Sequence, residues 1–151
     1  MKVRDICQRE VVTVRPQDDL LSAAHLMRDR HVGYLVVVQP GIKPATLKPV
    51  GVLTDRDLVV SVMAREANPR ELCVDDVMSR ELVAACEDDA LRVALAQMRR
   101  VGVRRLPVIG EYGELVGVLS IDDAIDALTQ ELAAVAGSIH AEQQVERTLR
   151  A

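Results

Sequence analysis

The chain contains two copies of one sequence pattern, and this internal repeat constrains the fold more than any other feature. The run Gly51-Val52-Leu53-Thr54-Asp55-Arg56-Asp57 reappears as Gly117-Val118-Leu119-Ser120-Ile121-Asp122-Asp123. Upstream of these runs, a shift of 71 positions aligns 36 residue pairs without a gap, from Val3/Val74 to Val38/Ile109, and 13 of the pairs are identical. A repeat of this length indicates two stacked supersecondary units.

The alignment also predicts how the chain is divided. The shift falls from 71 to 66 because the first copy has five extra residues within positions 39–49, a stretch rich in Pro and Gly that we expect to be a loop. We expect a first repeat at 1–64, a linker at 65–73, a second repeat at 74–128 and a C-terminal helical extension at 129–151. A unit of ~60 residues would be only marginally stable alone, because small units bury little surface, so we expect the two halves to share a core.

Composition narrows the classes of function. The chain is 49% hydrophobic but has no Phe, no Trp and two Tyr, so its core must consist of Val, Leu, Ile, Ala and Met. The β-branched residues among these favour strands. The net charge is −4, with a pI of about 5.4. Because nucleic-acid binders usually present a basic face or stacking aromatic residues, we expect no nucleic-acid partner.

The number and spacing of the reactive side chains do not indicate a redox, metal-binding or catalytic role. Cys7, Cys73 and Cys86 are odd in number and widely spaced, which argues against a disulfide framework or a zinc site. We find no nucleophile elbow and no His–carboxylate cluster with metal spacing, so we expect a non-enzyme without a metal or a catalytic cofactor. The N-terminus has no apolar signal core and no run approaches the length of a membrane span, which predicts a cytoplasmic protein without a membrane partner.

Hydrophobic periodicity predicts the same element order, β-α-β-β-α, in each repeat, and therefore an α/β (or α+β) class. In the first repeat we expect an extended segment at 11–14, a helix at 19–30 capped by Asp18, strands at 34–38 and 50–53, and a helix at 55–64. In the second repeat we expect an extended segment at 82–86, a helix at 90–100 capped by Asp89, and strands at 105–109 and 115–119 joined by a turn at 110–114.

The C-terminal region carries an apolar stripe with heptad-like spacing, made by Ile121, Ile125, Leu128, Leu132, Val135 and Ile139. Gly137-Ser138 interrupts the pattern, and we expect a helix to end there and a last helix to run to about Arg150. The stripe either packs on the sheet of its own chain or contacts a second protomer, and the sequence leaves both alternatives open.

The repeated run ends in a hydroxyl-x-x-Asp motif, Thr54-x-x-Asp57 and Ser120-x-x-Asp123, at the junction between a strand and a helix. A helix N-terminus attracts phosphate, a hydroxyl group can donate to a phosphate oxygen, and an Asp can accept hydrogen bonds from ribose hydroxyls. The same motif is also a capping box, which needs no ligand. Taken alone, the motif favours the cap.

With these residues in place, the chain resembles the CBS-domain family as a tandem pair over about residues 1–128. The resemblance is carried by the Gly-Val-Leu-Thr/Ser-x-x-Asp runs, by Asp18-x-Leu20-x-x-Ala23-x-x-x-Met27 with its echo at 89–98, and by residues 101–108. It implies a pseudo-two-fold pair, often called a Bateman module, with two clefts between the halves. In relatives these clefts bind adenosine-containing ligands such as AMP, ADP, ATP, S-adenosylmethionine or NAD.

The resemblance also implies a role for individual residues. It places Thr54 and Ser120 towards phosphate, and Asp57 and Asp123 towards ribose. The base pocket of one site would be lined by groups near Val12, Thr13, Val32 and Tyr34, and that of the other by groups near Val83, Ala84 and Val103. Arg104 and Arg105 either reach phosphate or are ordinary solvated side chains at the start of a strand.

The two copies depart from one another at the expected sites. Val36 stands where the second copy has Pro107, and Gly33-Tyr34 replace Arg104-Arg105. We therefore expect unequal sites, with a phosphate-rich ligand in the cleft that the arginines border. The expected function is a stand-alone regulatory module, acting as a homodimer on an unknown client protein. The alternative is a module with empty clefts that acts through its dimer surface and C-terminal helix.

Overall fold

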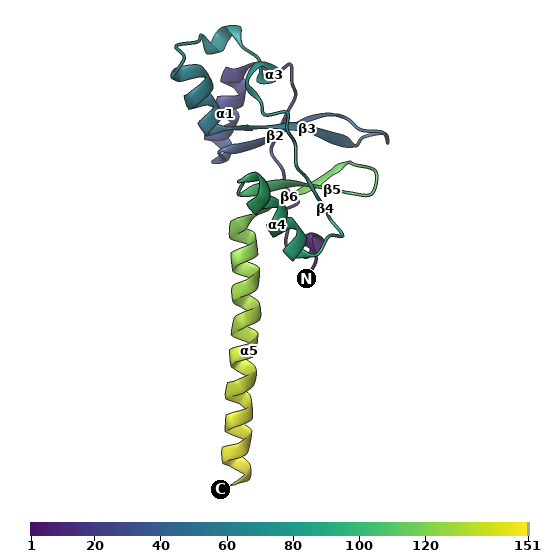
Figure 1. Ribbon diagram of the computed structural model, residues 1–151, viewed down its shortest axis with the longest axis vertical. Coiled ribbons are helices and arrows are strands. Elements are labelled where there is room, and N and C mark those ends of the chain that lie inside the picture. Colours follow the sequence, from purple (N-terminus) through teal and green to yellow (C-terminus); the bar gives the residue numbers. More distant parts are fainter. Residues whose placement is uncertain (151) are drawn as a thin grey trace.

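Two three-stranded sheets, one from each repeat, form the body of the molecule, and a long helix projects from the second repeat (Figure 1). The computed structural model describes residues 1–150. The strands are β1 (Thr13–Val14), β2 (Tyr34–Pro40), β3 (Leu47–Thr54), β4 (Ala85–Cys86), β5 (Arg105–Ile109) and β6 (Leu115–Ser120). The α-helices are α1 (Leu20–Arg30), α2 (Asp55–Asp57), α3 (Val74–Val77), α4 (Leu91–Val101) and α5 (Ile121–Leu149). The predicted α/β class with two β-α-β-β-α units is confirmed.

The two sheets have the same topology and the same register. In the order β1-β2-β3 and β4-β5-β6, the first pair of strands is parallel and the second pair antiparallel. Leu35 pairs with Leu53 in the first sheet, and Leu106 pairs with Leu119 in the second. All four leucines are at most 1% exposed, so equivalent residues of the two repeats occupy equivalent core positions.

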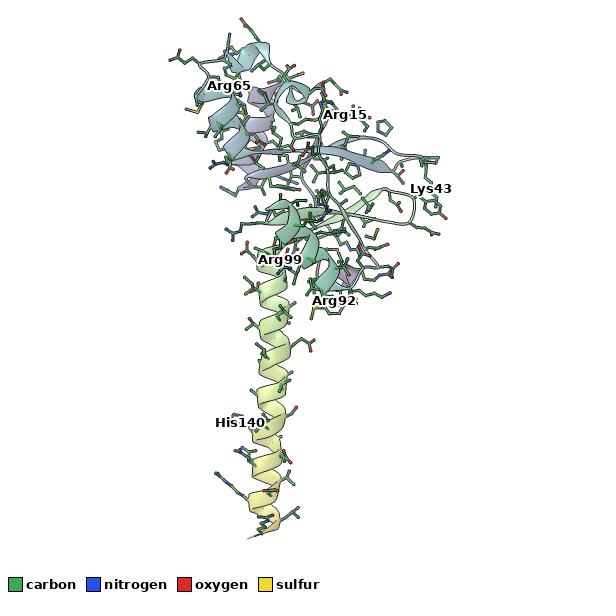
Figure 2. All side chains as sticks on the ribbon, viewed as in Figure 1. Arg15, Lys43, Arg65, Arg92, Arg99 and His140 are labelled. Atoms are coloured by element: carbon green, nitrogen blue, oxygen red, sulfur yellow. The ribbon has the colours of Figure 1, made fainter. Side chains whose placement is uncertain are left out.

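The first hairpin is longer than predicted. The strands β2 and β3 extend into the stretch expected to be a loop, and Pro40 pairs with Leu47. The hairpin lies beside the shorter β5–β6 hairpin, where the Nζ atom of Lys43 is 3.2 Å from the centre of the Tyr112 ring (Figure 2). The five extra residues therefore lengthen the β2–β3 strand pair and do not form a free loop.

The helix caps differ from the sequence-based expectation. Asp19, not Asp18, caps α1, and its Oδ1 atom accepts a hydrogen bond of 2.8 Å from the backbone N–H of Ser22. Asp18 instead accepts from the N–H of Arg15, and Asp89 accepts from the N–H of Cys86. These two carboxylates stabilise the turns that precede the helices, which is the other common role of Asp side chains.

The helices that follow the third strand of each repeat also depart from expectation. After α2 the chain continues as a wider π-helical segment, η2 (Leu58–Met63), within the helix expected at 55–64. In the second repeat, α5 is continuous over 29 residues, so the predicted interruption at Gly137-Ser138 is wrong. The Ser138 hydroxyl donates to the carbonyl oxygen of Ala134, 3.1 Å away, which is a bond that serine makes within helices. No helix within residues 1–150 is both long and apolar enough to span a membrane.

The expectation of one shared core is replaced by two separate cores that exchange a segment. Val3 and Cys7 pack into the core of the second repeat with Leu106 and Leu119. Val74 and Met78 pack into the core of the first. Val3 with Val74, and Cys7 with Met78, are equivalent under the shift of 71, so the exchange is reciprocal and ties the halves together.

Candidate functional site

Two clefts lie between the repeats, and each takes residues from both. The small cleft has a volume of about 260 Å³ and the large cleft of about 620 Å³. The small cleft is lined by Gln8, Glu10, Val11, Val12, His31, Val32, Gly33, Tyr34, Arg105, Val118, Ser120 and Asp123. The large cleft is lined by Gly33, Tyr34, Val52, Thr54, Asp55, Arg56, Ser79, Glu81, Leu82, Val83, Val101, Gly102, Val103, Arg104, Arg105 and Leu106.

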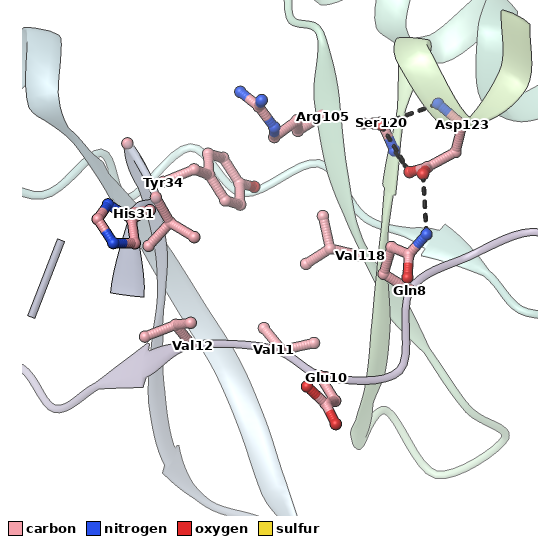
Figure 3. Close-up of a pocket in the computed structure, with 12 residues that line it drawn as sticks. Gln8, Glu10, Val11, Val12, His31, Tyr34, Arg105, Val118, Ser120 and Asp123 are labelled. Atoms are coloured by element: carbon pink, nitrogen blue, oxygen red, sulfur yellow. Dashed lines mark hydrogen bonds between the residues drawn. The ribbon is translucent and has the colours of Figure 1, made fainter. Parts of the chain in front are cut away.

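Each cleft combines apolar residues of one repeat with the hydroxyl-bearing motif of the other repeat. The small cleft joins the apolar residues of the first repeat, Val12 and Val32, to the hydroxyl-x-x-Asp motif of the second (Figure 3). The large cleft joins Val83 and Val103 to Thr54 of the first repeat. The crossing follows from the short segments that precede β1 and β4, because each reaches the third strand of the opposite repeat.

Two backbone bridges make that crossing. The N–H of Gln8 donates to the carbonyl of Val118, and the N–H of Val118 donates back, both at 2.9 Å. Ser79 and Val52 exchange the equivalent pair of bonds, at 2.9 and 3.1 Å. Gln8 and Ser79 thereby become cleft residues that the sequence reasoning missed. The shift of 71 aligns them, but nothing in their identity indicates a contact with the opposite repeat.

The Ser120–Asp123 motif forms a closed capping box that also faces the small cleft. Ser120 Oγ accepts from the N–H of Asp123 at 3.1 Å, and Asp123 Oδ2 accepts from the N–H of Ser120 at 2.9 Å. The Nε2 atom of Gln8 donates to the other oxygen, Oδ1, at 3.0 Å (Figure 3). Burial raises the pKa of Asp123, but the hydrogen bonds from Ser120 and Gln8 outweigh it and leave this pKa lowered. Asp123 therefore offers a charged acceptor at the cleft wall.

The Thr54–Asp57 motif forms a similar capping box at the large cleft. Thr54 Oγ1 accepts from the N–H of Asp57 at 3.1 Å, and Asp57 Oδ2 accepts from the N–H of Thr54 at 2.8 Å. Thr54 lines the large cleft, whereas Asp57, which was predicted to face ribose, lines neither cleft. The position equivalent to Gln8 is Ser79, whose short side chain makes no hydrogen bond to Asp57 among the described residues.

Tyr34 and Arg105 form the wall between the two clefts, because both residues line both cavities. Burial raises the pKa of the Tyr34 hydroxyl, and the nearby Arg105 opposes that effect. The hydroxyl thus stays protonated and able to donate.

The two clefts carry different charge. The large cleft is bordered by three arginines, Arg56, Arg104 and Arg105, against the two carboxylates of Asp55 and Glu81. The small cleft has one arginine, Arg105, against Glu10 and Asp123. Arg104 is exposed and its Nη2 atom lies 3.5 Å from Asp122, a weak contact that leaves its guanidinium available.

The structure brings most of the predicted site residues to the clefts. Of the predicted base-pocket residues, Val12, Val32 and Tyr34 line the small cleft, and Val83 and Val103 line the large one. Three predicted site residues line neither cleft: Asp57, Thr13, which pairs with Val36 in the sheet, and Ala84. Within residues 1–150 no group of His, Cys, Asp or Glu side chains is arranged to hold a metal ion.

Comparison with known proteins points to one family. The family model described as CBS domain matches residues 3–64 and 74–130. The CBS domain-containing protein YhcV of Bacillus subtilis is 34% identical over 132 residues, which cover 87% of this chain and 89% of that protein. The protein MK0525 of Methanopyrus kandleri is 30% identical over 125 residues. That match covers 83% of this chain but 61% of MK0525, so the chain spans less than two thirds of that relative.

A solved structure has the same fold. The CBS domain pair of protein MJ0100, in complex with 5′-methylthioadenosine and S-adenosyl-L-methionine, matches with a TM-score of 0.72 and 20% sequence identity. The match covers 87% of this chain and 98% of that one. At this level of identity the similarity establishes the fold and leaves the chemistry of the clefts to be argued from their own residues.

Proposed function

Since this chain belongs to the CBS domain family, we propose that it is a non-catalytic regulatory module that binds an adenosine-containing ligand in the clefts between its repeats. The observation that carries the proposal is the convergence at each cleft of a helix N-terminus, a hydroxyl-bearing side chain and an apolar wall. These are the groups that suit a phosphate, a sugar and a base. The ligands bound to the CBS pair of MJ0100 are of the same chemical class.

The large cleft is the proposed site for a phosphorylated ligand such as AMP, ADP or ATP. Its volume of about 620 Å³ lies within the range of roughly 300–1,000 Å³ that small-molecule sites occupy. Arg56, Arg104 and Arg105 outnumber its two carboxylates, and arginine binds phosphate through paired hydrogen bonds. Thr54 lies at the N-terminus of α2, where a phosphate oxygen would accept from its hydroxyl.

The small cleft is the proposed site for an uncharged or cationic adenosine derivative. Its volume of about 260 Å³ is below the usual range for ligand sites, and its carboxylates disfavour phosphate. Asp123 keeps a charged oxygen beside the cavity, as ribose hydroxyls require. A cationic adenosine derivative would match this charge better than a nucleotide.

A ligand panel tests the proposal on the purified full-length chain. Isothermal titration calorimetry with AMP, ADP, ATP, S-adenosylmethionine and NAD should find at least one binder, and Arg104→Ala with Arg105→Ala should weaken the phosphorylated ligands most. The matched control is Arg99→Ala with Arg100→Ala, which removes two arginines from the last turn of α4, outside both clefts. Equal losses in the two double variants would refute the assignment of the large cleft.

Ligand binding regulates only if it favours one arrangement of the two repeats over another. The proposed ligand touches both repeats at once, because each cleft is a crossed combination. The expected consequence is a change in contact with an unidentified client protein, and the proposed functional unit is a homodimer. In a homodimer, ligand binding to one module would then affect an assembly that contains two modules.

One observation favours a second candidate function, a ligand-free interaction module. Both hydroxyl-x-x-Asp motifs already satisfy the helix N-termini as closed capping boxes, so neither needs a ligand for stability. The candidates differ in the ligand panel, since an interaction module would bind none of the five compounds at millimolar concentration.

A further inference from the structure

The outer part of α5 carries an apolar surface that no other part of residues 1–150 covers. Every residue from 128 to 150 is exposed, and the helix leaves the body of the molecule as a single rod (Figure 1). Leu132 is 71% exposed, Val135 60% and Ile139 51%. An isolated helix gains most of its stability from packing of its apolar face. This face therefore needs a partner.

The apolar side chains form a continuous seam with coiled-coil spacing. Steps of three and four residues connect Ile125, Leu128, Leu132, Val135 and Ile139, which we call the α5 seam. The next two seam positions are Glu142 and Glu146, and the exposed Leu149 follows three residues later. The polar residues Gln130 and Gln144 lie on the opposite side of the helix, because they are separated from the seam by about half a turn.

A second copy of α5 matches this seam best when it runs antiparallel. A parallel pair would place Glu142 against Glu142 and Glu146 against Glu146 in the seam, where like charges repel at close range. An antiparallel pair centred between Ala133 and Ala134 places Leu132 against Val135 of the second copy and Leu128 against Ile139. It also separates the acidic inner ends of the two helices, which carry Asp122, Asp126 and Glu131.

A groove at the base of the helix provides a second, independent match. Met1, Leu91, Leu95 and Leu128 form an apolar groove of about 330 Å³ between α4 and α5, and Arg92 and Glu131 complete its lining. Leu128 belongs both to this groove and to the α5 seam, so the two apolar surfaces are continuous. The exposed face of α4 beside the groove is basic, with Arg92 and Arg99 at its two ends (Figure 2).

In the antiparallel arrangement the outer end of one α5 arrives at the groove of the other copy. Ile139 of the second copy lies over Leu128, and the carboxylates of Glu142 and Glu146 follow towards the basic face of α4. In this register Glu142 lies opposite Ile125 and Glu146 opposite Ile121 of the other copy, so neither glutamate faces another glutamate. The contact is self-complementary, as a two-fold symmetric interface requires.

We propose that α5 is the self-association element of this protein, pairing antiparallel with α5 of a second copy and seating its outer end in the α4–α5 groove. This inference does not rest on ligand binding in the clefts, which lie between the sheets. It identifies one surface for the homodimer and predicts that the two bodies lie at opposite ends of the paired helices.

The molar mass of the assembly tests the surface. Analytical ultracentrifugation of the full chain should find a dimer, and the double variant Leu132→Glu with Ile139→Glu should sediment at half that mass. The matched control, Gln130→Glu with Gln144→Glu, adds the same charge to the opposite face and should remain dimeric. A monomeric wild-type chain, or a seam variant that stays dimeric, would overturn the proposal.

Disulfide formation tests the orientation. Two chains are prepared with Cys86→Ser, which removes the exposed cysteine, and with either Leu128→Cys or Ile139→Cys. Under mild oxidation the mixture should give a cross-link between positions 128 and 139, while each chain alone should give none between its own copies. Cross-links within the separate samples would show a parallel pair instead. Far-UV circular dichroism confirms that each variant is folded, and an unchanged ligand titration separates this result from the function of the clefts.

Discussion

Tyr34 and Arg105 occupy equivalent positions of the two repeats and meet at the centre of the molecule, with the guanidinium carbon 5.9 Å from the centre of the tyrosine ring. This separation is within the range of a cation–π contact. The pseudo-symmetry is thus broken at this contact between the repeats, since one repeat contributes a cation and the other an aromatic ring. The same pair forms the wall that the two clefts share, and the large cleft adds Arg56 and Arg104.

Arg105 should therefore affect the two clefts unequally. Arg105→Ala removes the proposed phosphate donor from the large cleft, and we expect affinity for a phosphorylated ligand to fall by about tenfold or more, the usual effect of losing a charged hydrogen bond. Affinity for an uncharged adenosine derivative should change less. Calorimetry with AMP and adenosine measures the difference, and Arg100→Ala serves as control. Equal losses for both ligands would indicate that Arg105 supports the cleft wall without contacting phosphate.

The hydroxyl groups of the capping boxes should have a measurable structural role. Ser120→Ala removes the acceptor for the N–H of Asp123, and Thr54→Ala removes the acceptor for the N–H of Asp57. We expect each change to lower the free energy of unfolding by about 1 kcal/mol, as for other N-caps. Urea denaturation measures this loss, and Thr54→Ser, which keeps the hydroxyl, should restore most of it. If Thr54→Ala weakens ligand binding without a loss of stability, the hydroxyl acts on ligand alone.

The sequence predicted the elements of this fold well because the two repeats support each other's pattern. Strands β2, β5 and β6 were predicted because apolar runs bounded by turn residues are a local signal, and Leu35 and Leu106 lie in equivalent runs. The caps were less predictable. Asp18 and Asp19 are adjacent, and only the backbone angles of the entering turn decide which carboxylate reaches the helix. The same turn geometry assigns Asp89 to Cys86 rather than to α4.

Features that depend on the opposite repeat were not predictable from local patterns. By sequence, Val3 belongs to the first repeat and Val74 to the second, yet each is buried in the core of the opposite repeat. Gln8 contacts Asp123 across 115 positions of sequence. The continuity of α5 through Gly137 was missed for a different reason. A glycine within a helix costs only about 1 kcal/mol, and the sequence alone does not show whether the helical turns on either side stabilise the helix by more than this cost.

The exchange of segments predicts that the two repeats unfold together. Val3→Ala and Val74→Ala each remove two buried methyl groups from a side chain that is fully buried. We expect each to lower the free energy of unfolding by about 2 kcal/mol, from lost transfer energy and a residual cavity. Each variant should keep a single cooperative transition in urea. Val93→Ala, on the exposed face of α4, should cost much less. Two separate transitions in either core variant would contradict the coupling.

Stability should fall in acid because Asp123 and Asp76 both have lowered pKa values in the folded chain. Burial opposes the shift at Asp123 but its hydrogen bonds outweigh it, and at Asp76 the backbone N–H of Cys73 is the main cause. A carboxyl with a lowered folded-state pKa stabilises fully above its unfolded pKa of about 3.9, and this contribution is lost as the pH falls through the folded value. The free energy of unfolding should thus be level above about pH 5 and decline below about pH 4.

Asp123→Asn supplies the matching test of this acid dependence. Without a titrating carboxyl at position 123, the decline below about pH 4 should be shallower than in the wild type. Urea titrations across the acid range measure the slope. The control is Asp126→Asn, which removes an exposed carboxyl from the same helix. An identical slope for Asp123→Asn would mean that other carboxylates account for acid unfolding.

The glycines that open the repeated run should be intolerant of any side chain. A Cβ atom at Gly51 would lie 2.6 Å from the carbonyl oxygen of Ser79, and one at Gly117 would lie 2.8 Å from that of Gln8. Both contacts are closer than real Cβ atoms approach, and both involve backbone that cannot rotate away. Gly51→Ala or Gly117→Ala must therefore displace the segment that crosses from the opposite repeat. We expect a loss of about 1–3 kcal/mol in the free energy of unfolding, the usual cost of overpacking.

Gly137→Ala is the control, and we expect it to raise the free energy of unfolding where the other two glycine variants lower it. Nothing lies within 4 Å of a Cβ atom at this position of α5, so alanine adds no clash and raises helix propensity. It should stabilise the chain by up to about 1 kcal/mol. If Gly51→Ala and Gly117→Ala behaved like Gly137→Ala in urea denaturation, the close backbone approach between the repeats would be absent in solution. In that case the glycines of the repeated run would need another explanation, and so would the crossed construction of both clefts.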